Sequence, residues 1–205
     1  MIRDIISNDI ITVILFSTIF LIVILKKIEP STFYSNLSFR KKNLESKLVN
    51  NLLGFKKIDF LYKILYISNL SILLNFYIIN NFDLFTYLEF LKLISSFYLI
   101  KIFIELILSR LFNIKKIIKN YIYSKIVYRN SLGLLILFFN FLIIYSNYNQ
   151  IIPILLLLAI IYLVLSYFFI FFSMKKLIIK NWFYFILYLC TLEIIPYYYF
   201  FSNIL

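Results

Sequence analysis

The sequence contains no histidine, one cysteine, two glycines and one alanine. Without histidine, the chain alone cannot bind haem or zinc through an imidazole, nor use imidazole in acid–base catalysis. Its single cysteine, Cys190, lies in an apolar run and has no second cysteine for an internal disulfide, so packing is its expected role. Two isolated glycines, Gly54 and Gly133, cannot form a glycine-rich phosphate-binding loop. We therefore expect no cofactor and no metal site.

Charge is also scarce, since charged residues make up 15% of the 205 residues and hydrophobic residues 63%. A soluble domain of this size usually needs about a quarter of its residues charged to cover its surface. The composition therefore predicts an all-α protein, a polytopic transmembrane helical bundle whose main partner is the lipid bilayer. The net charge of +12 is expected to mark cytoplasmic connectors, not a nucleic-acid site.

Six apolar runs are each long enough to cross about 30 Å of hydrocarbon. They predict one integral membrane domain over residues 1–205, with spans at 10–25, 61–80, 88–109, 132–148, 151–173 and 182–202. The segment 112–126 is too polar to span, and its apolar residues recur at helical spacing. We expect this segment to form an amphipathic helix on the cytoplasmic face of the membrane.

Basic residues alternate between the connectors. The connectors after the first, third and fifth runs hold nine, six and three of the 21 lysines and arginines. The opposite side holds Arg3, beside Asp4 and Asp9, and the acidic Asp83. Because basic connectors stay in the cytoplasm, this alternation places both termini on the outer side, which is the periplasm if the protein is bacterial.

Lys101 and Glu193 lie deep in apolar runs, Glu105 lies nearer the end of its run, and Arg129 stands at the base of the fourth run. A charge at the centre of a span costs on the order of 3 kcal/mol, so such residues usually face the bundle interior and pair. We expect Lys101 to pair with Glu193 or with Glu105, and Arg129 to offer Glu105 a second partner. Two interpretations of these charged residues stay open. They either form part of a substrate or proton path, or they form a structural ion pair.

Three uncharged polar residues, Asn69, Asn140 and Ser17, fall near the depth of Lys101 in their runs. Together they are expected to form a polar layer across the bundle. This layer is either part of the same path or a structural feature without a further role.

Two stretches resemble a known family: KIFIELILSRLFNIKKIIKNYIYSKIVYRNSLG at 101–133 and FYFILYLCTLEIIPYYYF at 183–200. They are similar to a family of Bacteroidota inner-membrane proteins, known as domain of unknown function 4271. The matching residues are Lys101, Glu105, Asn113, Tyr121, Arg129, Asn130, Gly133, Glu193 and Pro196. A proline expected ahead of Asn140 is absent, which removes the expected cause of a kink there. The resemblance implies a bacterial inner-membrane location and no particular reaction.

Three functions remain open from the sequence. The first is a non-enzymatic inner-membrane component of an envelope-assembly or secretion machine, with a protein partner in the membrane. The second is a small transporter or a lipid-handling membrane enzyme that uses the buried lysine and glutamates. The third is an organelle-encoded subunit of a respiratory complex, because the favoured residues Ile, Leu, Phe, Tyr, Asn and Lys have AT-rich codons.

Overall fold

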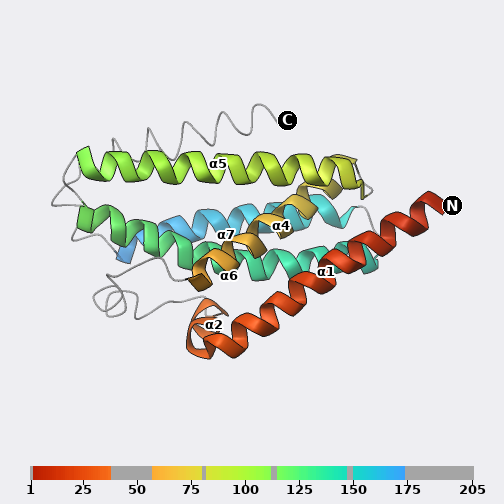
Figure 1. The fold of residues 1–205 in the computed structure, drawn as a ribbon, viewed down its shortest axis with the longest axis horizontal. Helices are drawn as coiled ribbons and strands as arrows, with labels where there is room; N and C mark the ends of the chain where they lie inside the picture. The colour runs from red at the N-terminus through yellow and green to blue at the C-terminus, as the bar shows by residue number, and fades with distance from the viewer. Residues whose placement is uncertain (1, 38–56, 80–81, 112–114, 147–149, 174–205) are drawn as a thin grey trace.

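The computed structural model describes residues 2–37, 57–79, 82–111, 115–146 and 150–173. These ranges contain five long helices and one short helix, and no strand. The helices are α1 (Ile2–Ile28), α2 (Pro30–Leu37), α4 (Lys57–Ile79), α5 (Leu84–Leu111), α6 (Lys115–Ser146) and α7 (Ile151–Ser173). The prediction of an all-helical protein is confirmed for the part of the chain that the structure describes (Figure 1).

Four of these helices are long and apolar enough to cross a membrane, over Asp9–Ile28, Asp59–Ile79, Tyr121–Ser146 and Ile151–Ser173. They contain or closely overlap the predicted spans 10–25, 61–80, 132–148 and 151–173. The predicted span 88–109 lies within α5, which is 28 residues long but carries more charge, including Glu89, Lys92 and Lys101. The predicted span 182–202 lies outside the described residues. The structure is therefore compatible with a membrane protein, and six spans are not confirmed.

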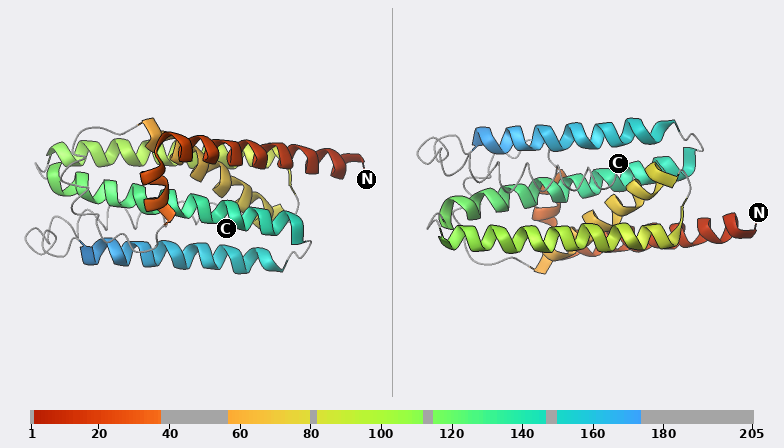
Figure 2. Two further views of the ribbon diagram at one scale, coloured as in Figure 1. Left: turned by 90° about the horizontal axis from the view of Figure 1, so that it is seen from below. Right: turned by 90° about the horizontal axis from the view of Figure 1, so that it is seen from above.

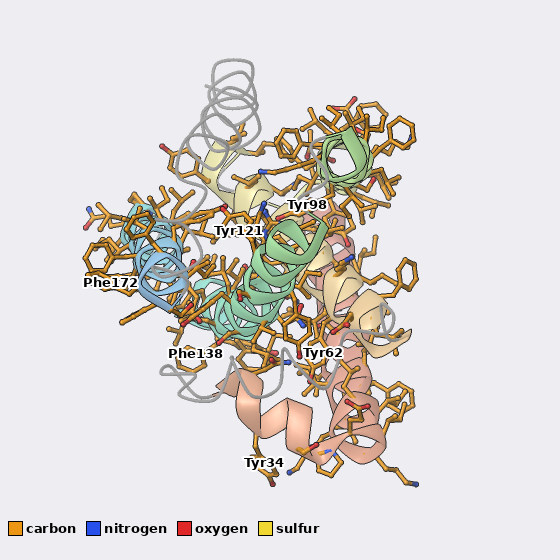
Figure 3. All side chains as sticks on the ribbon, turned by 90° about the vertical axis from the view of Figure 1, so that its left-hand side faces the viewer. Tyr34, Tyr62, Tyr98, Tyr121, Phe138 and Phe172 are labelled. Atoms are coloured by element: carbon orange, nitrogen blue, oxygen red, sulfur yellow. The ribbon has the colours of Figure 1, made fainter. Side chains whose placement is uncertain are left out.

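The outward surfaces of these helices are apolar, as a lipid environment requires. Phe138 on α6 is 60% exposed and Phe172 on α7 is 56% exposed. Figure 3 shows both side chains pointing away from the bundle. A water-soluble protein rarely leaves such large side chains uncovered over so much of its surface, so this surface suits contact with acyl chains.

The predicted interfacial helix over 112–126 is not confirmed. Residues 115–126 are the first three turns of α6, which continues without a break to Ser146; residues 112–114 lie outside the described part. No proline or glycine stands between Lys115 and Leu132, so nothing interrupts the helical hydrogen bonds. Tyr121 and Ile126 are buried against the bundle. In the structure, residues 115–126 are therefore one end of a longer helix.

A proline separates α1 from α2. Proline has no backbone N–H and its ring clashes with the carbonyl one turn earlier, so a helix ends before it, while the first turn of the next helix accepts it. Pro30 stands at this position, and the Phe33 N–H donates to the Glu29 carbonyl at 3.1 Å as α2 begins. The chain turns here, and α2 packs against α1 and α6.

Asp83 caps α5 at the opposite end of the bundle. Its carboxylate accepts from the backbone N–H and the hydroxyl of Thr86, each at 3.2 Å. The Asn75 side chain on α4 donates to the Asp83 carbonyl at 2.9 Å and accepts from the Asp83 N–H at 3.2 Å. An aspartate at this position satisfies N–H groups that the first turn of a helix leaves without intrahelical partners. These bonds fix the turn from α4 into α5.

Helices α4 and α6 form the centre of the bundle. Helix α4 crosses it obliquely and packs chiefly on α6, with α5 on one side, while α7 covers the other side of α6 (Figures 1 and 2). The two central helices approach closely at Gly133 of α6. A Cβ atom on Gly133 would lie 3.1 Å from the Tyr66 Cα and 3.3 Å from the Leu65 Cδ2 on α4. Glycine at a helix crossing allows two backbones to come this close, as is common in membrane bundles.

Candidate functional site

The residues singled out in the sequence fall into two places in the fold. Lys101 on α5 and Arg129 on α6 lie toward the end of the bundle where α5 is followed by α6. Glu105 follows Lys101 by one turn of α5, and its side chain lies outside the described part of the chain, as does all of Glu193. The structure therefore does not test the predicted ion pairs.

Lys101 is 4% exposed, although it carries a long charged side chain. A lysine is almost never this deeply buried unless its ammonium group is paired or hydrogen-bonded. The burial shows that Lys101 faces the interior of the bundle and not its outer surface. It lies one turn from Tyr98, the residue of α5 that contacts Arg129.

Arg129 stacks on a tyrosine of the neighbouring helix. Its guanidinium carbon lies 4.7 Å from the centre of the Tyr98 ring, the arrangement of a cation–π contact. Tyr98 in turn meets Tyr66 of α4 edge to face, with ring centres 5.8 Å apart. Three helices thus each contribute one member to this stack, which holds the planar guanidinium in a fixed orientation.

A second basic residue of α6, Lys125, is buried one turn before Arg129. It is 3% exposed, and its ammonium group lies 5.3 Å from the centre of the Tyr121 ring, one turn earlier on the same helix. Figure 3 labels Tyr121 on α6 and Tyr98 on α5. Residues 121, 125 and 129 are spaced by four, so they share one face of α6.

These residues border a pocket between α4, α5 and α6, which we call the cationic pocket. Its volume is about 30 Å³, which exceeds the space that one water needs. The polar residues that line it are Lys63, Tyr66, Tyr98, Lys125, Arg129 and Asn130, and the apolar ones are Ile67, Ile102, Ile122 and Ile126. None of the described residues that line it is a carboxylate. The described lining thus contributes three basic side chains, Lys63, Lys125 and Arg129.

The basic residues of three helices lie at a similar distance from one end of the bundle. Measured along each helix axis at 1.5 Å per residue, Lys63 is about 24 Å from Ile79, and Lys101 and Arg129 are about 26 Å from Leu84 and Ser146. These three helix ends lie at the same end of the bundle in Figure 1. The three basic residues therefore lie at about the same level along the bundle.

The second place is the contact between Asn140 on α6 and Asn69 on α4, both fully buried. The Asn140 amide nitrogen donates to the Asn69 carbonyl at 2.9 Å and to the Asn69 Oδ1 at 3.3 Å. The Asn140 Oδ1 has no hydrogen-bond partner among the described residues. Ser17 does not join them, because it is exposed on α1 and its hydroxyl donates to the Ile14 carbonyl of its own helix.

Sequence reasoning missed two of the three basic residues that line the pocket. It assigned Lys63 and Lys125 to cytoplasmic connectors, whereas the structure places them within α4 and α6. Lys63 already stood inside the apolar run 61–80, and Lys125 lies four residues from both Tyr121 and Arg129. These positions in the sequence could have indicated that both lysines belong to the helical bundle. The tyrosines of the pocket could not be singled out in this way, because the chain contains 18 tyrosines and none of them stands out.

The lining groups are suited to binding an anion. Arginine offers a planar fork of donors that fits phosphate or carboxylate, lysine adds a point charge, and tyrosine and asparagine can donate further hydrogen bonds. Such bonds are stronger inside a bundle than in water, because the local dielectric is lower. Among the described residues, no group of three histidines, cysteines or acidic side chains is placed to hold a metal ion.

Comparison with known proteins gives one match. A family model described as "Domain of unknown function (DUF4271)" matches residues 11–204, which is nearly the whole chain. No curated protein and no solved structure matches. The match includes Arg129, which lines the pocket, Gly133 at the central helix crossing, and the buried Lys101.

Proposed function

This chain belongs to the family described as domain of unknown function 4271, and from its own helices and pocket we propose that it is a multi-pass protein of the bacterial inner membrane, in Bacteroidota. In this proposal the chain crosses the membrane six times, α5 is the third span, and residues 182–202 form the sixth. Both termini lie in the periplasm. The cationic pocket then lies at the level of the inner leaflet.

The orientation rests on charge and on the direction of the helices. The end of the bundle at which α5 is followed by α6 carries Lys115, Lys116 and Lys119, while the opposite end carries the acidic cap Asp83. Basic residues are retained on the cytoplasmic side during insertion. The burial of Lys101 also supports α5 as a span, because its charge faces inward and away from lipid.

Reporter fusions test this topology. We expect fusions after Asn50 and Lys180 to report the cytoplasm, and fusions after Asn147 and at Leu205 to report the periplasm, because each basic connector stays inside. Paired reporters, one active only in each compartment, give the measurement. A cytoplasmic signal from the fusion at Leu205 contradicts the six-span arrangement.

Within the membrane we propose that the protein is a non-enzymatic component of an envelope-assembly or secretion machine. The observation that carries this is the cationic pocket, whose lining supplies cations and hydrogen-bond donors, the groups of a binding site. All described helices also belong to one bundle, so the protein acts within or beside the membrane. Its role is then to hold an anionic group and a protein partner together in the inner membrane.

Affinity purification from the native host in a mild detergent tests this role. We expect a partner from an envelope-assembly or secretion machine to be recovered in near-stoichiometric amount, and in two different detergents. A tagged multi-pass protein of similar size and unrelated function is the control, and the partner should be absent from it. Recovery of the chain without any such partner in both detergents contradicts the proposal.

A second candidate, a small transporter that uses Lys101, Glu105 and Glu193, is favoured by one observation. Lys101 is buried at the same depth as Lys63 and Arg129, so a polar region extends across three helices inside the bundle. Ionisable groups inside membrane bundles often mark substrate or proton paths. Proton or solute flux into vesicles that contain only the purified chain would distinguish a transporter from an assembly component.

A further inference from the structure

We propose that the corner between α1 and α2 binds the headgroups of anionic phospholipids in the inner leaflet. This corner consists of the exposed residues Lys26, Lys27, Ile28, Ser31 and Tyr34, and we call it the α1–α2 corner. The inference rests on the topology proposed above, which places this end of α1 on the cytoplasmic side. It names a lipid partner, and it holds whether the protein works in an assembly machine or as a transporter.

The α1–α2 corner lies at the level where two apolar spans end. The apolar span of α1 ends at Ile28, and that of α4 begins at Asp59. Leu25 of α1 shares one buried cluster with Tyr62 and Leu65 of α4, so the two spans end side by side. In the proposed topology, this level is the boundary between the hydrocarbon and the headgroups of the inner leaflet.

Helix α2 runs across the direction of the long helices at this level (Figure 2). It packs on α1 and α6, and its inward side chain Asn36 is 4% exposed. Tyr34 is 59% exposed and points away from the bundle (Figure 3). A helix that crosses the spans at this boundary lies along the membrane surface. Tyrosine is favoured there, because its ring is apolar and its hydroxyl is polar.

The charges at the α1–α2 corner differ in the direction that they face. Lys26 and Lys27 are exposed in the last turn of α1. Glu29, two residues further along, is half-buried and lies near the buried Tyr62 of α4. The outward surface is therefore positive, while the neighbouring acidic group faces the bundle. Lysines beside the inner leaflet attract anionic headgroups, whereas a zwitterionic headgroup gains less because its own ammonium group is repelled.

Fluorescence quenching in nanodiscs tests the proposal. The full chain carries Cys190→Ser and a fluorophore attached through Ser31→Cys, at an exposed position of α2. The nanodiscs contain phosphatidylcholine and a small fraction of a lipid with a nitroxide quencher near its headgroup, either phosphatidylglycerol or phosphatidylcholine. We expect the phosphatidylglycerol quencher to be enriched at the label at least about fivefold over the phosphatidylcholine quencher, because each lysine near the surface contributes about this factor.

Three variants and one control locate the selectivity. In Lys26→Gln/Lys27→Gln the two quenchers should become equally effective, whereas Lys26→Arg/Lys27→Arg keeps both charges and should retain the enrichment. Tyr34→Ala should weaken quenching by both lipids alike, because it removes the aromatic anchor and no charge. The matched control, Lys92→Gln, removes an exposed charge of α5 outside the α1–α2 corner and should retain the enrichment.

Each contrary result overturns the proposal in a different way. Equal quenching by the two lipids before any charge is removed shows that the α1–α2 corner does not select anionic lipid. A label that neither lipid quenches, but that iodide in the water reaches fully, shows that α2 lies away from the membrane and suits a soluble partner. Enrichment that survives Lys26→Gln/Lys27→Gln shows that other residues cause it. None of these results alters the reporter topology or the co-purified partner, so failure here is separable from failure of the proposed function.

Discussion

Gly133→Leu is expected to lower the free energy of unfolding by about 3 kcal/mol or to prevent accumulation of the folded protein. A Cβ atom at this position already lies 3.1 Å from the Tyr66 Cα, which is a backbone atom and cannot rotate away. The leucine side chain therefore forces α6 away from α4 along the main contact of the bundle. Unfolding by titration with sodium dodecyl sulfate, followed by circular dichroism, measures the loss.

Two controls separate crowding at the crossing from a general effect of substitution. Phe138→Leu changes an exposed residue of the same helix, so its stability should stay within about 0.5 kcal/mol of the wild type. Gly133→Ala adds only the Cβ atom, and its gain in helix propensity of about 1 kcal/mol opposes the contact. A stable Gly133→Leu protein, with the wild-type unfolding midpoint, would show that α4 and α6 do not depend on this close approach.

Lys101→Ala is expected to cost about 3 kcal/mol of stability, because it leaves the carboxylate of its proposed partner Glu193 buried without a counter-charge. Glu193→Ala should cost a similar amount, because it leaves the ammonium group of Lys101, which is 4% exposed, without its proposed counter-charge. The double variant Lys101→Ala/Glu193→Ala should be more stable than either single variant, because no isolated charge remains. The same detergent unfolding assay, applied to all four proteins, gives the coupling free energy.

Additive losses in this cycle would show that the two residues do not interact, and Glu105 would then be tested as the partner of Lys101 in the same way. Lys92→Ala is the matched control, since Lys92 lies on the same helix but is exposed. Its loss should be small. A double variant that folds normally but does not support the growth of cells would show that the pair also has a role beyond stability.

The helices predicted most accurately from the sequence are those whose ends are determined by residues next to them in the chain. The predicted span 151–173 matches α7 at both ends, because its apolar run begins after a polar connector and is free of charge. Lys101 and Arg129 were singled out because a charge within or beside an apolar run stands out, and the ion pairs predicted for them stay predictions. The separate helix predicted at 112–126 from its polar composition is not confirmed, because no residue in 115–126 breaks α6.

The cationic pocket was beyond sequence reasoning for a different reason. Counting basic residues by connector establishes the side of the membrane but not which way each side chain faces, so Lys63 and Lys125 were assigned to connectors outside the bundle. Their inward direction depends on how α4 crosses α6, and that crossing depends on Gly133 meeting Tyr66, two residues far apart in sequence. Contacts of this kind leave no periodic signal along the chain.

The unbroken course of α6 has a mechanical consequence. The helix is about 48 Å long, and Gly133 lies about 27 Å from Lys115 and about 20 Å from Ser146. Helix α6 can therefore tilt as a rigid rod about its closest contact with α4, which lies near the middle of the helix. A tilt of about 10° around this point moves the two ends in opposite directions, by about 5 Å and about 3 Å. Lys125 and Arg129 lie on the longer arm, about 12 Å and about 6 Å from Gly133, so they move less than Lys115 in such a tilt.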